Sequence, residues 1–217
     1  MQILLCAATP FEIESTTNFI KKQGLNQKID VLITGVGLVA TTYTLMKQII
    51  SKRPDIMLQA GIGGCFDQAI PLSQTVAINK DTIGDLGVIE NDYFRTVFEL
   101  NLLSSTQSPW QEGWLTNPHA PLLEMCGLPQ AAGVSVNQIT TQKNMVAHFK
   151  NTLGAHVESM EGAAFHYLGL QENIPFLQVR SLSNYVGERN KAAWQLAPAI
   201  ESLNTSLQEV LIKLLPA

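Results

Sequence analysis

The chain begins MQILLCAATPFEIE (residues 1–14), and this stretch indicates the fold. The apolar run from Gln2 to Ala8 is typical of a buried strand, and the residues after it predict a helix that begins at Pro10. The same alternation of a short β-rich run with a longer helical pattern recurs along the chain. It favours an α/β fold in which crossover helices connect a largely parallel sheet.

Further strands are expected at residues 29–33, 55–59 and 175–182, and further helices after Gly37, near 141–151, at 161–172 and at 192–215. In the last helix the apolar residues recur at intervals of three and four: Trp194, Ala197, Ile200, Leu203, Leu207, Val210 and Leu214. Residues 81–130 hold several prolines and glycines, and we expect loops, some strand and one wall of a pocket there. With no repeat or linker, residues 1–217 are expected to form one domain.

The composition restricts the possible partners. A net charge of −4, with 14 Lys and Arg in 217 residues, gives no dense basic patch, so nucleic-acid binding is disfavoured and a small-molecule partner is expected. The cysteines Cys6, Cys65 and Cys126 are odd in number and lack CxxC spacing. This pattern favours buried, reduced thiols over a disulfide framework or a zinc site. The chain has no signal peptide pattern and no membrane-spanning stretch, so a cytoplasmic protein is expected.

In open α/β sheets, ligands bind at the carboxyl ends of the strands, so the residues that follow each strand are candidates for a binding site. TPFE (residues 9–12) follows the first strand. Thr9, Pro10 and Glu12 fit a capping box at a helix start, and Glu12 also fits a general base. Both roles stay open at this point, and they are compatible.

Two glycine-rich segments follow the next strands. TGVGLVA (residues 34–40) matches the dinucleotide fingerprint G-x-G-x-x-A, but the acidic residue that should end the next strand is missing. These glycines therefore fit a close approach of backbone to backbone or to a ligand better than a nicotinamide site. AGIGG (residues 60–64), which includes Gly61 and Ile62, fits either a nucleoside-binding loop or a plain tight turn.

The most specific segments are VESMEGAA (residues 157–164) and VRSLSNY (residues 179–185). The small residues at 162–164 allow a helix start to pack closely on a sheet, with Met160 and Glu161 at its head. Taken alone, these two residues also fit a core methionine and a first-turn charge. Arg180 lies in an apolar strand and needs a buried partner, for which Glu161 is the economical choice.

SMEGAA and VRSLSN, together with TPFE, TGVG and AGIGG in the same order, resemble the methylthioadenosine/adenosylhomocysteine nucleosidases and the wider nucleoside phosphorylase superfamily. The resemblance spans nearly the whole chain. It implies a three-layer α/β/α fold around a twisted, mostly parallel sheet, an assembly into a homodimer or larger homo-oligomer, and no cofactor or metal.

The resemblance also implies roles for single residues. Glu12 falls on the family's water-activating glutamate, Met160 on its sugar-packing methionine and Glu161 on the glutamate that binds the ribose diol. Arg180 falls on the strand arginine near that glutamate. The purine is expected to contact backbone at Gln138 and Ile139.

The chain departs from the adenine-specific enzymes at two positions. They carry an aspartate as leaving-group acid where this chain has Asn184, and an acidic residue where it has Ser159. With the continuation SNYVGERN (residues 183–190), this resembles the futalosine hydrolase branch, which releases hypoxanthine in an alternative menaquinone route. Departing hypoxanthine presents the donor N7–H beside the acceptor O6, and an amide both accepts and donates, so Asn184 suits it.

The expected activity is hydrolysis of a purine nucleoside with Glu12 as general base. A phosphorylase needs cationic groups or several backbone donors near C1′, and the single arginine of the N-terminal third, Arg53, precedes a strand and does not follow one. An adenine-type nucleosidase and a non-catalytic nucleoside-binding relative are further alternatives. A cation such as Arg95 or Arg189 would suit the carboxylate that futalosine carries at its 5′ end.

Overall fold

The computed structural model describes residues 1–91 and 93–215. Its central sheet has the strand order β10-β4-β8-β9-β3-β1-β2, and a short strand, β7, pairs with β4. These strands are β1 (Ile3–Ala7), β2 (Ile29–Ile33), β3 (Ile56–Cys65), β4 (Thr75–Asp81), β7 (Leu115–Thr116), β8 (Gln130–Ser135), β9 (Val157–Ser159) and β10 (Phe176–Tyr185). Among the described residues, five strand pairs of this sheet are parallel and three are antiparallel, so it is mixed with a parallel majority.

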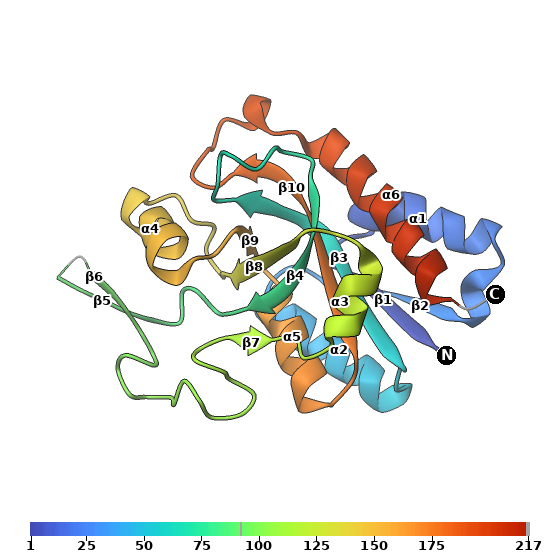
Figure 1. The fold of residues 1–217 in the computed structure, drawn as a ribbon, viewed down its shortest axis with the longest axis horizontal. Coiled ribbons are helices and arrows are strands. Elements are labelled where there is room, and N and C mark those ends of the chain that lie inside the picture. Colours follow the sequence, from blue (N-terminus) through green and yellow to red (C-terminus); the bar gives the residue numbers. More distant parts are fainter. Residues whose placement is uncertain (92, 216–217) are drawn as a thin grey trace.

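Helices cover both faces of the sheet (Figure 1). One face carries α1 (Pro10–Lys22), α3 (Ala120–Cys126) and α6 (Leu196–Leu214), and the other carries α2 (Leu38–Ser51) and α5 (Gly162–Gln171). This arrangement confirms the predicted three-layer α/β/α fold.

The residues of β1 explain why the helices lie on both sides. Ile3, Leu5 and Ala7 belong to the core that α1 and α6 cover, whereas Leu4 and Cys6 belong to the core that α2 and α5 cover. Successive side chains of a strand point to opposite faces, so a strand that is apolar at every position needs cover on both. Full burial of one such aliphatic side chain contributes about 1.5 to 3 kcal/mol.

One side of the sheet closes on itself. Because β10 pairs with β3 on one side and with β4 on the other, the strands β3, β9, β8, β4 and β10 form a ring. The strands β4, β8 and β9, which complete this ring, were not predicted from the sequence. Closure brings the carboxyl ends of β3 and β10 beside β9.

Two predicted strands are longer than expected. β3 continues from residue 59 to Cys65 and β10 continues from residue 182 to Tyr185. AGIGG and Asn184 therefore lie inside strands, and the interpretation of AGIGG as a turn or loop was wrong.

The segment 81–130 holds more regular structure than predicted. It contains the hairpin β5 (Gly87–Glu90) and β6 (Tyr93–Thr96), strand β7 and helix α3. Helix α3 was missed because its Pro121 was interpreted as a loop residue. A proline in the first turn of a helix loses no backbone hydrogen bond, so it fits there.

Two helical segments differ from the prediction. The helix expected at 141–151 is α4 (Lys143–Ala147), which continues as a π-helix (His148–Leu153). The last helix begins at Leu196, because residues 191–193 form a 3₁₀ turn. Trp194 consequently precedes the helix and Ala197 is exposed, so two of the seven residues in the predicted apolar repeat do not lie on the buried face of α6.

The three cysteines are buried and unpaired, as expected. Over the described ranges, none of the helices combines the length and the apolar character needed to cross a membrane.

Candidate active site

A pocket of about 310 Å³ opens where β1, β3 and β10 end, at the predicted edge of the sheet. Six of the predicted site residues line it: Glu12, Ile62, Ile139, Met160, Glu161 and Asn184. Further lining residues include Thr9, Phe11, Gly64, Glu158, Ser159, Arg189 and Trp194. Gly61 and Arg180 lie behind this lining, and Gln138 lies in a neighbouring cavity.

Glu12 is held at both carboxylate oxygens. Its Oε2 accepts hydrogen bonds from the backbone N–H of Thr9 at 3.0 Å and from the Thr9 hydroxyl at 2.9 Å. Its Oε1 accepts from the N–H of Ile62 on β3 at 3.1 Å. Glu12 therefore joins the start of α1 to β3 and also lines the pocket, so the capping role and a role in the pocket are geometrically compatible.

Helix α1 is interrupted directly after Glu12, where Ile13 has non-helical backbone angles. The buried amide of Asn204 from α6 fills the gap. Its Nδ2 donates to the carbonyl of Glu12 at 2.9 Å, and its Oδ1 accepts from the N–H of Thr16 at 2.9 Å. The amide thus replaces the missing bond between residues 12 and 16, and α6 fixes the first turn that carries Glu12.

Glu161 and Arg180 form a buried ion pair. The guanidinium Nη2 lies 3.4 Å from Oε2 of Glu161 and also donates to Oε1 of Gln59 at 3.0 Å. Arg180 thus has the partner that its place in an apolar strand predicted. The other oxygen of Glu161 accepts from the N–H of Gly37 at 3.2 Å, so the TGVG glycine brings backbone against the pocket carboxylate.

Gly61 explains why the AGIGG segment is rich in glycine although it is a strand. A Cβ at this position would collide with Nη1 of Arg180 and would lie 3.0 Å from Oε1 of Glu12. Any other residue would displace one of these two groups. The glycine therefore makes room for side chains of the site, and it does so without forming a turn.

A buried polar network continues behind Arg180. In the amide orientation that satisfies its neighbours, Gln178 accepts from Nε of Arg180 at 3.2 Å and donates to His166 and Asp81. Asp81 also accepts from the hydroxyl of Ser135 at 2.9 Å. Burial raises the pKa of Asp81 to about 7 and lowers that of His166 to about 4. This network holds the arginine in one orientation.

Asn184 faces the pocket near the end of β10 with spare hydrogen-bonding capacity. Its Oδ1 accepts from the hydroxyl of Ser183 at 2.9 Å and its Nδ2 donates to the carbonyl of Tyr185 at 3.1 Å. A side-chain amide has two lone pairs and two N–H groups, so one of each remains for a ligand.

The pocket therefore combines three carboxylates and an amide at one edge of an α/β sheet, with a buried arginine behind them. The family model described as "Phosphorylase superfamily" matches residues 5–215. The chain belongs to this superfamily.

The curated proteins that this chain resembles are futalosine hydrolases. The chain is 28% identical over 190 residues to the futalosine hydrolase of Streptomyces coelicolor, covering 82% of this chain and 76% of that protein. It is 24% identical to the futalosine hydrolase of Thermus thermophilus, over 83% and 80% of the two chains. The predicted resemblance to this branch and the predicted enzyme class, an N-glycosidic hydrolase, are confirmed by these relatives.

Solved structures share the superfamily fold. A methylthioadenosine/adenosylhomocysteine nucleosidase from Neisseria meningitidis, in complex with methylthio-immucillin-A, matches with a TM-score of 0.81 at 17% identity over 99% of both chains. Futalosine hydrolase of Helicobacter pylori matches with a TM-score of 0.76 at 15% identity over 98% of both chains.

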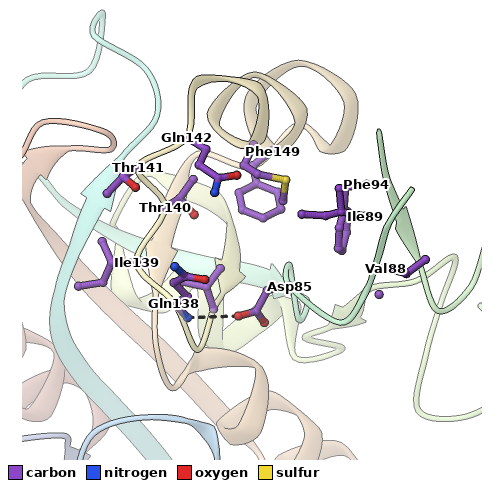
Figure 2. A pocket seen from close by; sticks show the side chains of 13 residues that line it. Asp85, Val88, Ile89, Phe94, Gln138, Ile139, Thr140, Thr141, Gln142 and Phe149 are labelled. Carbon is purple, nitrogen blue, oxygen red and sulfur yellow. Dashed lines mark hydrogen bonds between the residues drawn. The ribbon is translucent and has the colours of Figure 1, made fainter. Parts of the chain in front are cut away.

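The resemblance predicted that backbone at Gln138 and Ile139 contacts the purine, but these two residues line different sets of cavities. Ile139 lines the pocket described above and also a neighbouring cavity of about 470 Å³. Gln138 lines the neighbouring cavity alone, and its N–H donates to Asp85 at 3.2 Å (Figure 2). Val88 and Phe94 line the same cavity, so the predicted pocket wall from segment 81–130 lies there.

Sequence reasoning missed two pocket residues, Glu158 and Trp194, and one residue behind the pocket, Asn204. Glu158 was quoted within VESMEGAA but not singled out, although an acidic residue in a short apolar strand is a signal. Trp194 was interpreted as part of the apolar repeat of the last helix. Asn204 does not touch the pocket, and nothing in its local sequence sets it apart from other polar positions of an amphipathic helix.

Proposed function

We propose that the chain hydrolyses the N-glycosidic bond of futalosine, releasing hypoxanthine and leaving dehypoxanthine futalosine, without a cofactor. The observation that carries this proposal is the amide of Asn184 in the same pocket as the carboxylates of Glu12 and Glu161. The names of the curated relatives support the same substrate. We propose the futalosine route of menaquinone biosynthesis as its pathway and, from the free cysteines, the cytoplasm as its compartment.

In this mechanism Glu12 orients a water beneath C1′ of the ribose and takes its proton as the glycosidic bond breaks. The three hydrogen bonds to its carboxylate fix its position. Glu161 accepts hydrogen bonds from the ribose hydroxyls and stabilises the positive charge that develops on the sugar. Arg180 positions Glu161 through their ion pair.

Asn184 stabilises the departing base. As electrons flow into hypoxanthine, its N7 gains a proton and becomes a donor beside the acceptor O6. The spare lone pair and the spare N–H of the amide match these two groups. A carboxylate would match the two donors of adenine instead, so the residue at 184 favours a 6-oxopurine.

Arg189 is the better placed of the two cations considered for the 5′ carboxylate. It lines the pocket, and its guanidinium lies 5.6 Å from the ring of Trp194, which lines it too. Arg95 instead pairs with Glu90 on the β5–β6 hairpin. We therefore assign the 5′ carboxylate to Arg189.

Incubation of the enzyme with futalosine, inosine and methylthioadenosine, with and without phosphate, tests the proposal when the freed base is identified by chromatography. Hypoxanthine release from futalosine without phosphate supports it. Strict dependence on phosphate would indicate a phosphorylase, and adenine release from methylthioadenosine alone would indicate the adenine-type nucleosidase. Arg189 is the one cation among the described residues that line the pocket, and Arg53 pairs with Glu172, so a phosphorylase is less well supported.

Replacement of Asn184 by aspartate is expected to change base choice. In Asn184→Asp a carboxylate faces O6 of hypoxanthine, acceptor against acceptor, whereas an adenine amino group gains a partner. The kcat/KM for 6-oxopurine nucleosides should fall by about 10- to 100-fold, because an unpaired buried polar group costs about 1 to 3 kcal/mol. Activity on amino analogues should fall less or rise.

The two substrates should be compared across pH, since the new carboxyl becomes a donor if it takes up a proton. Equal losses on both bases at every pH would show that Asn184 does not read position 6.

We also propose that the chain forms a homodimer or larger homo-oligomer through α2. This helix exposes Val39, Tyr43 and Ile50, which share one stripe at intervals of four and seven residues. Such a contiguous apolar stripe is typical of a surface that another protein covers. In sedimentation velocity, Tyr43→Glu should shift the assembly toward monomer, whereas Ile212→Glu on α6 serves as an exposed apolar control. A monomeric wild-type chain would contradict the proposal.

A further inference from the structure

Glu158 is a carboxylate of the pocket that the mechanism above does not use. It lies in the middle of β9, is 7% exposed and lines the same pocket as Asn184. Its Oε1 accepts from the N–H of Thr140 at 3.2 Å. Its Oε2 is buried and, within the described part of the chain, has no hydrogen-bond partner. Burying a carboxylate oxygen without a hydrogen bond costs free energy, so a ligand that offers a donor at this position would be favoured.

The strand register places Glu158 opposite Asn184. Gly64 of β3 pairs with Glu158 on one side and with Asn184 on the other. Residues that are paired across strands share one face of the sheet, so the two side chains flank a glycine that has no side chain of its own. Two strand spacings of roughly 4.8 Å separate them, which leaves a slot for the edge of a planar base.

The bond to Thr140 limits how Glu158 acts. The loop at 137–140 is anchored twice, because Asp85 accepts from the N–H groups of Asn137 and Gln138 while Glu158 accepts from that of Thr140. One oxygen of Glu158 is thus committed to the loop. Burial raises the pKa of the Glu158 carboxyl, as expected for a group that lacks its full set of donors.

We infer that Oε2 of Glu158 accepts the N1–H of a 6-oxopurine whose O6 and N7 are bound by Asn184. This inference rests on the proposed function and names a second residue that sets its base specificity. The edge of departing hypoxanthine reads donor, acceptor, donor at N1, O6 and N7. A carboxylate at N1 and an amide at O6 and N7 complement all three groups. Adenine presents a lone pair at N1, so it would meet Glu158 acceptor against acceptor.

Glu158→Gln tests this inference. If the oxygen of the new amide keeps its hydrogen bond to the N–H of Thr140, the NH₂ group faces N1–H, which places donor against donor. If the amide rotates, its oxygen faces N1–H but the hydrogen bond to Thr140 is lost. The kcat/KM ratio of inosine to adenosine should therefore fall by about 10- to 100-fold. Asp85→Asn is the matched control, because it disturbs the anchor of the same loop without changing the polarity offered to the base, and it should leave this ratio unchanged. Melting temperatures establish that both variants fold.

A ratio within about twofold of wild type in Glu158→Gln, or an equal change in Asp85→Asn, would overturn the inference and leave Glu158 as a loop anchor. Calorimetry of free hypoxanthine and free adenine binding to wild type and to Glu158→Gln gives the ratio of their dissociation constants, which reports base preference without turnover. It therefore decides the inference even if the enzyme fails to hydrolyse futalosine, a failure that by itself would contradict the proposed function.

Discussion

Glu12→Gln is expected to fold and to bind the nucleoside but to lose most of its turnover. General-base action is typically worth about 10² to 10⁴ in rate, so kcat should fall by that factor while KM changes little. The amide retains one oxygen for the N–H of Thr9 or of Ile62, and its NH₂ faces the other donor. Loss of one such hydrogen bond costs about 1 kcal/mol, so the melting temperature should fall by only a few degrees.

Glu14→Gln is the matched control, because Glu14 lies exposed on the same helix two residues further on. It should retain wild-type kcat. Single-turnover rates and substrate dissociation constants, measured for both variants, separate the chemical step from binding. If Glu12→Gln kept a kcat near that of wild type, Glu12 would be a capping residue and the water would need another base.

The layers of the fold could be predicted because local patterns determine them. The apolar run of β1 and the 3.6-residue periodicity of α6 are visible in the sequence, and both faces of the sheet follow from them. The closure of the ring could not be predicted in this way. It depends on β4, β8 and β9, of which β9 has only three residues and carries no period of its own.

The candidate site was predictable where a residue lies at or just beyond the carboxyl end of a strand. Glu12, Glu161 and Asn184 lie at the expected edge, and Arg180 has the expected partner. Long-range contacts were not predictable. Asn204 bonds to a carbonyl 192 positions away in the chain, and only the packing of α6 on α1 brings the two together.

Glu161→Gln is expected to lower kcat/KM by about 10- to 150-fold for each charge-assisted hydrogen bond that it loses, because such a bond is worth about 1.5 to 3 kcal/mol. The ribose hydroxyls bind most strongly when the sugar carries positive charge, so the variant should also discriminate less against 2′-deoxy substrates. Stability should fall as well, since Arg180 is left buried without its counter-charge, a change that typically costs about 3 to 5 kcal/mol.

A second variant separates these two effects of Glu161. In Glu161→Gln/Arg180→Met both buried charges are absent, so the melting temperature should recover part of its loss while activity stays low. Glu172→Gln, which removes a surface ion pair with Arg53 at the other end of α5, should change neither activity nor the preference for ribose. The decisive measurement is the ratio of kcat/KM for inosine to that for 2′-deoxyinosine. An unchanged ratio in Glu161→Gln would show that Glu161 holds Arg180 in place without binding the sugar.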